Sequence, residues 1–516
     1  MSGSVWRSRR CLLSTGFAAL LLGVLLVVLL LQPWSNREPR FLRATVASNG
    51  YECASIGRKI LEKDGTAVDA AIATLFCEGV SCAQCMGLGG GFLATVYDAP
   101  TKQVRALNAR ERAPLATKMD MYQNASSRIG GLAIAVPGEL RGYGELYKDY
   151  GRLPWADLVE PTIKLCRNGQ RVTNYMARVL QTNSDRIKEE PTMREVYLNP
   201  ETGEVWREGD LIKHPQLAET LTVIAKEGPE AIHNGSLTDR LVQDIQELGG
   251  IITAEDLRSF RVVWDDPIAV PLTTEGHTLY SVPLPGSGSV LAFILNVLRD
   301  WVGDDTAAPT SSNLYWHRVI ETFKYAYAKR TGLGDPNRTL LNQYIRELEK
   351  NLSDPEWAKI VSQANRRPAN VPRLEALRRV VRRRRRPRHR TRGCGRRRRW
   401  GSQRRSRSLG FILNNEMDDF AIPNRESAYG LPPSPANMLG PGLQPLSSMT
   451  PLHRAQGQRT GARYWSCGRH ENHHTSLSDC TSHYFGGWKS ISRHGPPATS
   501  SPVGAHGRRL RAEFQS

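Results

Sequence analysis

One arginine, two carboxylates and two serines in this sequence could together hold the head group of an amino acid. An α-amino acid presents an ammonium group, which needs acceptors, and a carboxylate, which needs fork-shaped donors and hydroxyl groups. Carboxylate side chains can serve the first group, and an arginine with hydroxyl groups can serve the second. The candidate residues for such a site are Arg110, Glu416, Asp419, Ser447 and Ser448.

Each of these motifs, taken alone, also has an ordinary structural interpretation. The acidic segment 414–420 crowds like charges, which a cationic ligand or a metal would relieve, but such a run is also typical of a solvated turn. An arginine after the strand-like segment 104–107 is typical of a surface ion pair, and adjacent serines are typical of a turn. Only the combination predicts a ligand site.

The elements that must position these residues indicate a mixed α and β fold. Apolar residues at helical spacing predict two packed helices within residues 51–80. A glycine run at 87–91 then leads into a predicted strand at 92–97. A nucleotide-binding loop follows a strand and opens a helix, so this order argues against one. Further predicted elements are helices at 217–224, 239–248 and 313–327 and a strand at 410–413.

The positive charge of the chain is concentrated in one arginine tract. The 516 residues carry a formal net charge of +20, and residues 373–407 hold 18 arginines and one acid. This tract therefore supplies +17, and the rest of the chain is nearly neutral. Because it has no apolar period, we expect it to form no packed element. Nucleic acid, heparin or anionic lipid could bind such a tract, but we expect no nucleic-acid partner.

Residues 11–31 carry no charge and predict a transmembrane signal anchor. As a helix they would extend about 31 Å, which matches a hydrocarbon core of about 30 Å. Arginines precede this segment, so we expect residues 1–10 to be a cytoplasmic tail. Residues 32–44 would then be a stalk, and the protein a single-pass type II protein of the plasma membrane.

The predicted extracellular part contains four acceptor sequons for N-linked glycans, which fit a glycosylated surface. They lie at Asn124, Asn234, Asn337 and Asn351.

No metal ion or other cofactor is expected. The cluster most suggestive of zinc lies near the end of the chain, but its spacing fits no standard ligand pattern. It consists of Cys467, His470, His473, His474 and Cys480.

Eight segments in order along the chain resemble motifs of the gamma-glutamyltransferase (glutathione hydrolase) family. Two short segments could coincide by chance, but eight in family order could not. The resemblance covers roughly residues 45–370 and 406–449. The segments are 67–71, 86–91, 108–111, 135–139, 151–155, 328–336, 414–420 and 445–449.

This resemblance implies an α/β (α+β) fold of the N-terminal nucleophile hydrolase type, a four-layer αββα sandwich made by a precursor that cuts itself. The new N-terminal threonine attacks the γ-glutamyl amide of glutathione or another γ-glutamyl compound. Water, or an acceptor amino acid or dipeptide, then resolves the acyl-enzyme, while a Gly-Gly pair stabilises the oxyanion. The resemblance also implies a disulfide between Cys53 and Cys77.

The resemblance assigns a role to each residue of the candidate site. Arg110 would bind the α-carboxylate of the substrate together with Ser447 and Ser448. Glu416 and Asp419 would hold the α-amino group.

The sequence departs from the family at its catalytic residue. The family places a Gly-Gly-Thr before the acidic motif, but the arginine tract occupies that interval, and its only threonine, Thr391, follows no glycines. The expected oxyanion pair after Ser448 is also missing, because Gly486 and Gly487 lie among other neighbours. Burying an ion costs several kcal/mol, so the tract cannot replace a central strand. We therefore expect an incomplete sandwich.

Two interpretations of function remain. The chain is either a γ-glutamyl hydrolase and transferase, or a catalytically inactive glutamate-binding or structural membrane protein. Because residues 373–405 and 451–516 begin abruptly, we hypothesise that both are out-of-frame segments of a gene model or pseudogene. The remaining regions would be a large-subunit-like part at 45–372 and a small-subunit-like, substrate-binding part at 406–450, with an unstructured tail after residue 450.

Overall fold

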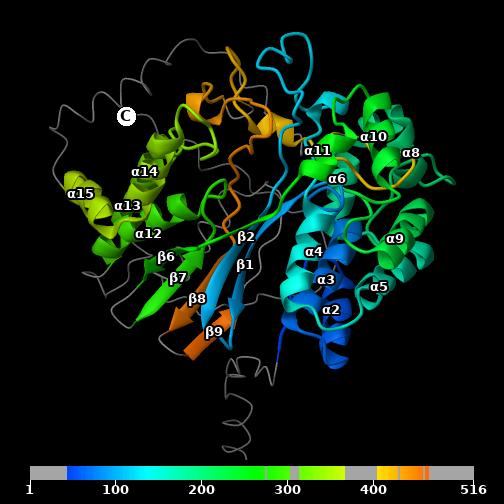
Figure 1. Cartoon of the computed structure of the whole chain (residues 1–516), viewed down its shortest axis with the longest axis horizontal. Helices are drawn as coiled ribbons and strands as arrows, with labels where there is room; N and C mark the ends of the chain where they lie inside the picture. The colour runs from blue at the N-terminus through cyan, green and yellow to red at the C-terminus, as the bar shows by residue number, and fades with distance from the viewer. Residues whose placement is uncertain are drawn as a thin grey trace, which may run out of the picture.

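Two small sheets lie between two groups of helices in the computed structural model (Figure 1). A helical group packs against the outer face of each sheet, and a small apolar cluster that includes Leu93 and Val282 lies where the sheets meet. The structure describes residues 44–272, 276–302, 313–366, 402, 404–427, 430–456 and 459–463.

The described helices and strands agree closely with the elements predicted before residue 370. The α-helices are α2 (Cys53–Glu62), α3 (Ala67–Ser81), α4 (Glu139–Tyr150), α5 (Trp155–Asn168), α6 (Asn174–Thr182), α7 (Ser184–Glu189), α8 (Pro191–Tyr197), α9 (Pro215–Glu227), α10 (Thr238–Glu247), α11 (Ala254–Ser259), α12 (Gly288–Val302), α13 (Asn313–Arg330), α14 (Asn342–Ser353) and α15 (Pro355–Arg366). The strands are β1 (Phe92–Asp98), β2 (Gln103–Ala109), β3 (Gln170–Arg171), β4 (Leu211–Ile212), β5 (Val263–Asp265), β6 (Ile268–Pro271), β7 (His277–Ser281), β8 (Leu452–Gln456) and β9 (Arg459–Arg463).

The first sheet has the order β1-β2-β5 and is antiparallel throughout. Its register pairs Phe92 with Ala109, so β2 ends directly before Arg110. Helices α2 to α5, α9 and α10 share one apolar core with β1 and β2. This core fixes the end of β2, and with it the position of Arg110.

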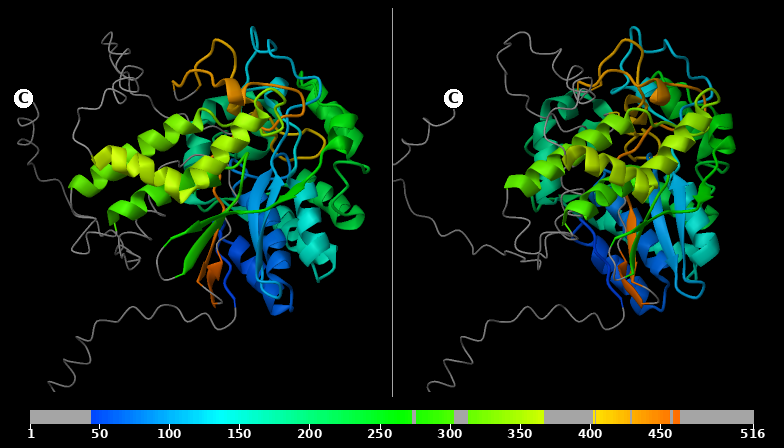
Figure 2. Two further views of the ribbon diagram at one scale, coloured as in Figure 1. Left: turned by 60° about the vertical axis from the view of Figure 1, so that its left-hand side comes forward. Right: turned by 90° about the vertical axis from the view of Figure 1, so that its left-hand side faces the viewer.

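The second sheet has the order β6-β7-β8-β9, and helices α12 to α15 form a separate bundle beside it (Figure 2). Contacts between the two sheets join β1 to β8, where the rings of Tyr97 and His453 stack with centroids 5.0 Å apart. The two sheets are therefore held together by side chains that lie more than 300 residues apart in the sequence.

The helix pair α2–α3 confirms the two helices predicted within residues 51–80. A disulfide joins Cys53 to Cys77, as the family resemblance implied. Helix α3 begins with a capping box, in which Thr66 Oγ1 accepts from the Asp69 amide and Asp69 Oδ2 accepts from the Thr66 amide. These bonds satisfy backbone donors that a helix start otherwise leaves open.

The predicted strand at residues 410–413 does not form part of either sheet. Leu413 and Ile412 make only isolated bridges, with Gly89 and Arg405. Gly410 has a φ of 82° and closes a tight turn, which leaves too short a run for a strand.

The arginine tract was predicted to form no packed element, and this is wrong for its last residues. Ser402 and Arg405 are buried, and Arg405 is only 4% exposed. Polar partners from other elements satisfy this arginine, so its charge does not exclude it from the interior.

The tail after residue 450 was predicted to be unstructured, and this is wrong for residues 452–456 and 459–463, which form β8 and β9. Strand β8 pairs with β7 from Leu452 opposite Ser281 to Gln456 opposite His277. Backbone hydrogen bonds with an available strand edge need no apolar pattern in the added strand.

Residues 11–31, the predicted membrane anchor, lie outside the described residues. Among the residues that the structure describes, no helix is both long and apolar enough to cross a membrane. The four sequon asparagines are all exposed, and glycan attachment at them stays a prediction.

We expect Asp69→Ala to lower the free energy of unfolding by about 2 to 4 kcal/mol. Asp69 is buried, and its carboxylate also accepts from the Arg152 amide (3.1 Å) and the Leu153 amide (3.3 Å), which would lose their partner. Urea unfolding followed by circular dichroism measures the change. Asp157→Ala, at an exposed aspartate in the first turn of α5, is the matched control and should change stability by less than about 1 kcal/mol.

Candidate functional site

The guanidinium of Arg110 lies at the centre of a buried polar cluster. Its Nη2 forms an ion pair with Glu416 and donates to Asp419 Oδ2 at 3.0 Å. Its Nε donates to the carbonyl of Pro445 at 2.8 Å, and Nη2 also donates to the carbonyl of Leu446 at 3.0 Å. The structure thus brings three of the five predicted site residues into direct contact.

Two side-chain amides fix the segment that carries Arg110. Asn108 Oδ1 accepts from the Arg110 amide, and Asn108 Nδ2 donates to Gln444 Oε1 at 2.8 Å. Gln444 Nε2 donates back to the Arg110 carbonyl at 2.7 Å, and the Gln444 amide donates to Asp335 Oδ2 at 2.6 Å. The end of β2 is therefore clamped to the chain that precedes the two serines.

The acidic motif forms a short 3₁₀ helix, Glu416–Asp419, positioned by Asn414. Asn414 Nδ2 donates to the carbonyls of Gly89 (2.8 Å) and Ala135 (2.7 Å). Its Oδ1 accepts from the Ala135 amide and from the amide of Glu416. One buried side chain thus orients the acidic turn against the glycine run and the segment before α4.

The predicted serines lie on the chain just beyond the carbonyls that bind Arg110. Ser447 is fully buried, its Oγ accepts from the Met449 amide at 3.0 Å, and its own amide donates to Pro285 O at 2.8 Å. Ser448 is half-buried, and its Oγ accepts from Arg330 Nη2 at 3.4 Å. Both hydroxyls are therefore held in place beside the cluster.

The two acids bound to Arg110 differ in exposure. Glu416 is 1% exposed, whereas the side chain of Asp419 is 30% exposed and faces solvent. Asp418 turns elsewhere, accepting from Ser127 Oγ at 2.6 Å and pairing with Arg128. The acidic motif therefore supplies one buried and one accessible carboxylate to the site.

Sequence reasoning missed four residues that shape this site. Asn414 and Asn108 lie inside segments that predicted the site, and Gln444 directly precedes one, so a buried amide beside a functional residue was the available signal. Arg330 belongs to a family-like segment but was given no role. The four residues are Asn108, Arg330, Asn414 and Gln444.

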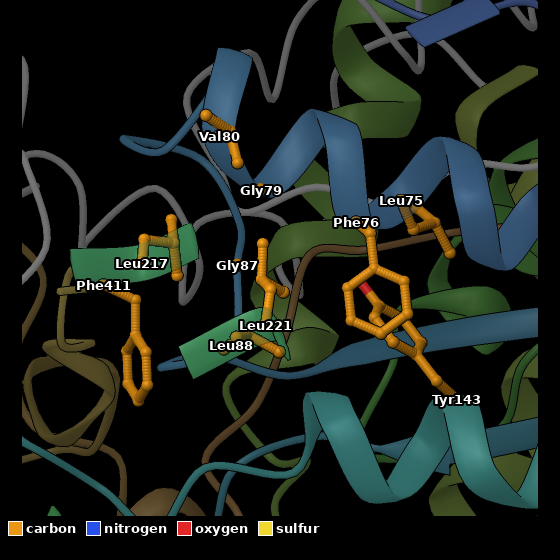
Figure 3. Close-up of a pocket in the computed structure, with 10 residues that line it drawn as sticks. All are labelled: Leu75, Phe76, Gly79, Val80, Gly87, Leu88, Tyr143, Leu217, Leu221 and Phe411. Atoms are coloured by element: carbon orange, nitrogen blue, oxygen red, sulfur yellow. The ribbon is translucent and has the colours of Figure 1, made fainter. Parts of the chain in front are cut away.

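A small apolar hollow lies away from this cluster, between α3, α4 and α9 (Figure 3). Phe76, Tyr143, Leu221 and Phe411 are among its lining residues. No charged side chain lines it, so it cannot pair with a zwitterion.

The chain before the acidic motif is anchored by Arg405. Its Nη2 donates to Gln216 Oε1 at 2.7 Å, Nη1 donates to the carbonyl of Thr192 at 3.2 Å, and Nη1 also pairs with Glu195. Burial, reinforced by the Arg405 guanidinium, lowers the pKa of His214 to about 3. The anchor therefore keeps a neutral histidine beside a fixed positive charge.

Some sequence expectations fall outside the described residues. Thr391, the pair at 486–487 and the cysteine and histidine cluster at 467–480 all lie there. Within the described ranges, no group of three or more histidine, cysteine or acidic side chains could hold a metal ion.

The family model for gamma-glutamyltranspeptidase matches residues 53–388 and 397–462. The chain belongs to the gamma-glutamyltranspeptidase family. This match confirms the resemblance and extends beyond the limits predicted from the motifs, into both segments that were predicted to be aberrant.

Individual relatives support this membership. The chain is 38% identical over 421 residues to Scoloptoxin SSD14 of Scolopendra dehaani, covering 79% of this chain and 72% of that protein. It is 36% identical over 429 residues to glutathione hydrolase 3 of Arabidopsis thaliana, covering 79% of this chain and 64% of that protein. The structure of gamma-glutamyltranspeptidase from Helicobacter pylori matches with a TM-score of 0.57 and 28% identity, over 64% of this chain and 93% of that chain.

The pH dependence of stability should reveal the neutral histidine. His214 has a folded pKa of about 3, below its unfolded value of 6.5, so the unfolded chain binds more protons at acidic pH. Its contribution is present above pH 6.5 and is lost as the pH falls below that value, by about 2 kcal/mol at pH 5. Urea unfolding at pH 7.5 and pH 5 should therefore show a smaller loss on acidification for His214→Gln than for the unchanged protein.

His317→Gln, at an exposed histidine of α13, is the control and should keep the full pH dependence. An equal pH dependence in His214→Gln and the unchanged protein would contradict a buried neutral His214.

Proposed function

We propose that this protein binds glutathione or another γ-glutamyl compound through the α-amino-acid head group, at Arg110, Glu416 and Asp419. The observation that carries the proposal is the contact of one buried guanidinium with two carboxylates, one of which reaches solvent. Membership of the gamma-glutamyltranspeptidase family supports the same ligand class.

Binding exchanges partners within the cluster. The ligand carboxylate takes the place of Asp419 on the Arg110 guanidinium, and the freed Asp419 accepts from the ligand ammonium together with Glu416. The head group carries one charge of each sign, so this exchange leaves no charge unpaired. Ser447 and Ser448 lie beside the position of the ligand carboxylate.

The fold that carries this site is an incomplete N-terminal nucleophile hydrolase sandwich. Two sheets between two helical groups, and structural likeness to gamma-glutamyltranspeptidase, support this proposal. The hairpin β8–β9 occupies the edge of the second sheet, where the chain continues after the serines.

Hydrolysis and γ-glutamyl transfer in this family require a threonine nucleophile, for which the sequence offers no Gly-Gly-Thr before the acidic motif. We therefore propose that the chain recognises the γ-glutamyl group, remains one piece and does not turn it over. The curated relatives are longer than the matched part of this chain, which spans 64% to 72% of the two described above.

We also propose that the protein is a type II plasma-membrane protein anchored by residues 11–31, with the site on the extracellular side. The exposure of Asn124, Asn234, Asn337 and Asn351 and the disulfide between Cys53 and Cys77 support an extracellular setting.

Asp419→Asn should weaken glutathione binding about 10-fold to 100-fold, because it removes one charge-assisted hydrogen bond to the ammonium group. Isothermal titration of the purified full chain measures the dissociation constant. Asp418→Asn is the matched control, since Asp418 pairs with Ser127 and Arg128, and it should leave the affinity within about threefold. Glutathione acetylated on its α-amino group should bind as weakly to the unchanged protein as glutathione binds to Asp419→Asn. If the unchanged protein bound glutathione and acetylated glutathione with equal affinity, the proposed role of Glu416 and Asp419 would be contradicted.

Expression in secretory cells separates binding from turnover. We expect one uncut band on an immunoblot and no γ-glutamyl amide hydrolysis by the same membranes. Two fragments with turnover would show that the nucleophile lies elsewhere in the chain and that the protein is a working hydrolase.

A further inference from the structure

Two thiols lie at the end of α3, outside the site described above. Cys82 is the C-cap residue of α3, and Cys85 follows in the next turn. Neither takes part in the disulfide between Cys53 and Cys77. Cys82, Ala83, Gln84 and Cys85 form a Cys-x-x-Cys sequence, a spacing typical of dithiols that cycle with a disulfide.

The turn brings the two cysteines within bonding range. The Cys85 amide donates to the Cys82 carbonyl at 2.8 Å, which closes a four-residue turn. Such a turn keeps its end Cα atoms within about 7 Å, and a disulfide spans about 4.4 to 6.8 Å between Cα atoms. A disulfide between them therefore needs little more than rotation of the side chains.

The two thiols differ in access. Cys85 is half-buried and donates to the Tyr175 hydroxyl at 3.7 Å, whereas Cys82 is 5% exposed and accepts from Gln84 Nε2 at 3.3 Å. The adjacent Cys85 thiol, together with burial, holds the pKa of the Cys82 thiol well above its usual value. An external reagent therefore reaches Cys85 first, and Cys82 reacts second, from within the protein.

We propose that Cys82 and Cys85 form a redox-active dithiol that reduces small aliphatic disulfides and becomes an intrachain disulfide. The Cys85 thiolate attacks one sulfur of the small disulfide, forming a mixed disulfide and releasing one small thiol, which takes up the proton that Cys85 lost. Cys82 then attacks Cys85 Sγ, and the second small thiol leaves with the proton of Cys82. The dithiol loses two electrons, and the small disulfide gains them.

The position of this dithiol links it to the glycine run at 87–91. The Gly87 amide donates to Glu139 Oε2 at 3.1 Å, and the Gly89 carbonyl accepts from Asn414, which orients the acidic motif. A disulfide would tighten the turn that leads into this run. The exchange itself uses no γ-glutamyl group, so it goes beyond the proposed function and does not depend on it.

The test uses cystamine, an aliphatic disulfide without a γ-glutamyl group, so glutathione turnover cannot affect the result. The full chain, reduced and freed of reductant, is treated with cystamine, alkylated, and mapped by tandem mass spectrometry. We expect the unchanged protein to lose two hydrogen atoms by forming a bond between Cys82 and Cys85. Cys166→Ser, at another buried thiol, should behave identically.

The single variants separate the two steps. Cys82→Ser should retain cysteamine on Cys85, because the second thiol is missing, and Cys85→Ser should react at least about 10-fold more slowly at Cys82, because that thiol is buried. The proposal is overturned if the unchanged protein keeps both thiols in cystamine. It is also overturned if, in the unchanged protein, cysteamine stays on Cys85 while Cys82 remains a thiol.

Discussion

The buried charge of Arg110 is the constraint on which the two family-like parts of this chain depend. Its side chain and that of Glu416 are each 1% exposed. A buried ion carries an effective penalty of several kcal/mol, and it is retained only when its hydrogen bonds are satisfied. The partners that the structure gives the Arg110 guanidinium come from residues 416–446, more than 300 positions away. Without that segment the arginine would be buried and unpaired, so the large-subunit-like and small-subunit-like parts must fold as one unit.

The need of buried polar groups for hydrogen-bond partners also explains how the acidic motif is held in position although a strongly basic stretch of sequence precedes it. Arg405 and Asn414 are buried, and each binds backbone carbonyls of elements far away in sequence. Gly89 is needed at this junction, since a Cβ there would lie 2.2 Å from the Ile412 carbonyl oxygen. Close backbone approach and buried polar side chains thus fix the site to the helical core, together with the apolar side chains of Leu409, Phe411 and Leu413, which are part of that core.

The parts of the fold that the sequence predicted are those set by local patterns. Helices α3 and α9 follow from apolar spacing, and the acidic motif from its own composition. The packing of Arg405 and the pairing of β8 depend on partners about 170 to 210 residues away, so no local pattern could predict them. The roles of Asn108 and Gln444 could not be predicted for the same reason. Their side-chain amides hydrogen-bond each other, and only the fold brings them together.

The pairing of β8 with β7 also shows why the site can form although the sequence after residue 450 has no apolar pattern. The chain leaves Arg110 at the Pro445 and Leu446 carbonyls, passes Ser447, and joins the edge of β7 at Leu452. Ser287 and Ser281 hold this stretch by donating to the carbonyls of Ser447 and Pro451. Backbone groups at a strand edge can pair with a strand of almost any sequence. The two serines are therefore held between Arg110 on one side and β7 on the other, whatever the sequence of the residues that follow. Recognition of a head group therefore needs less of the family fold than catalysis does, since only catalysis requires the nucleophile and the oxyanion amides.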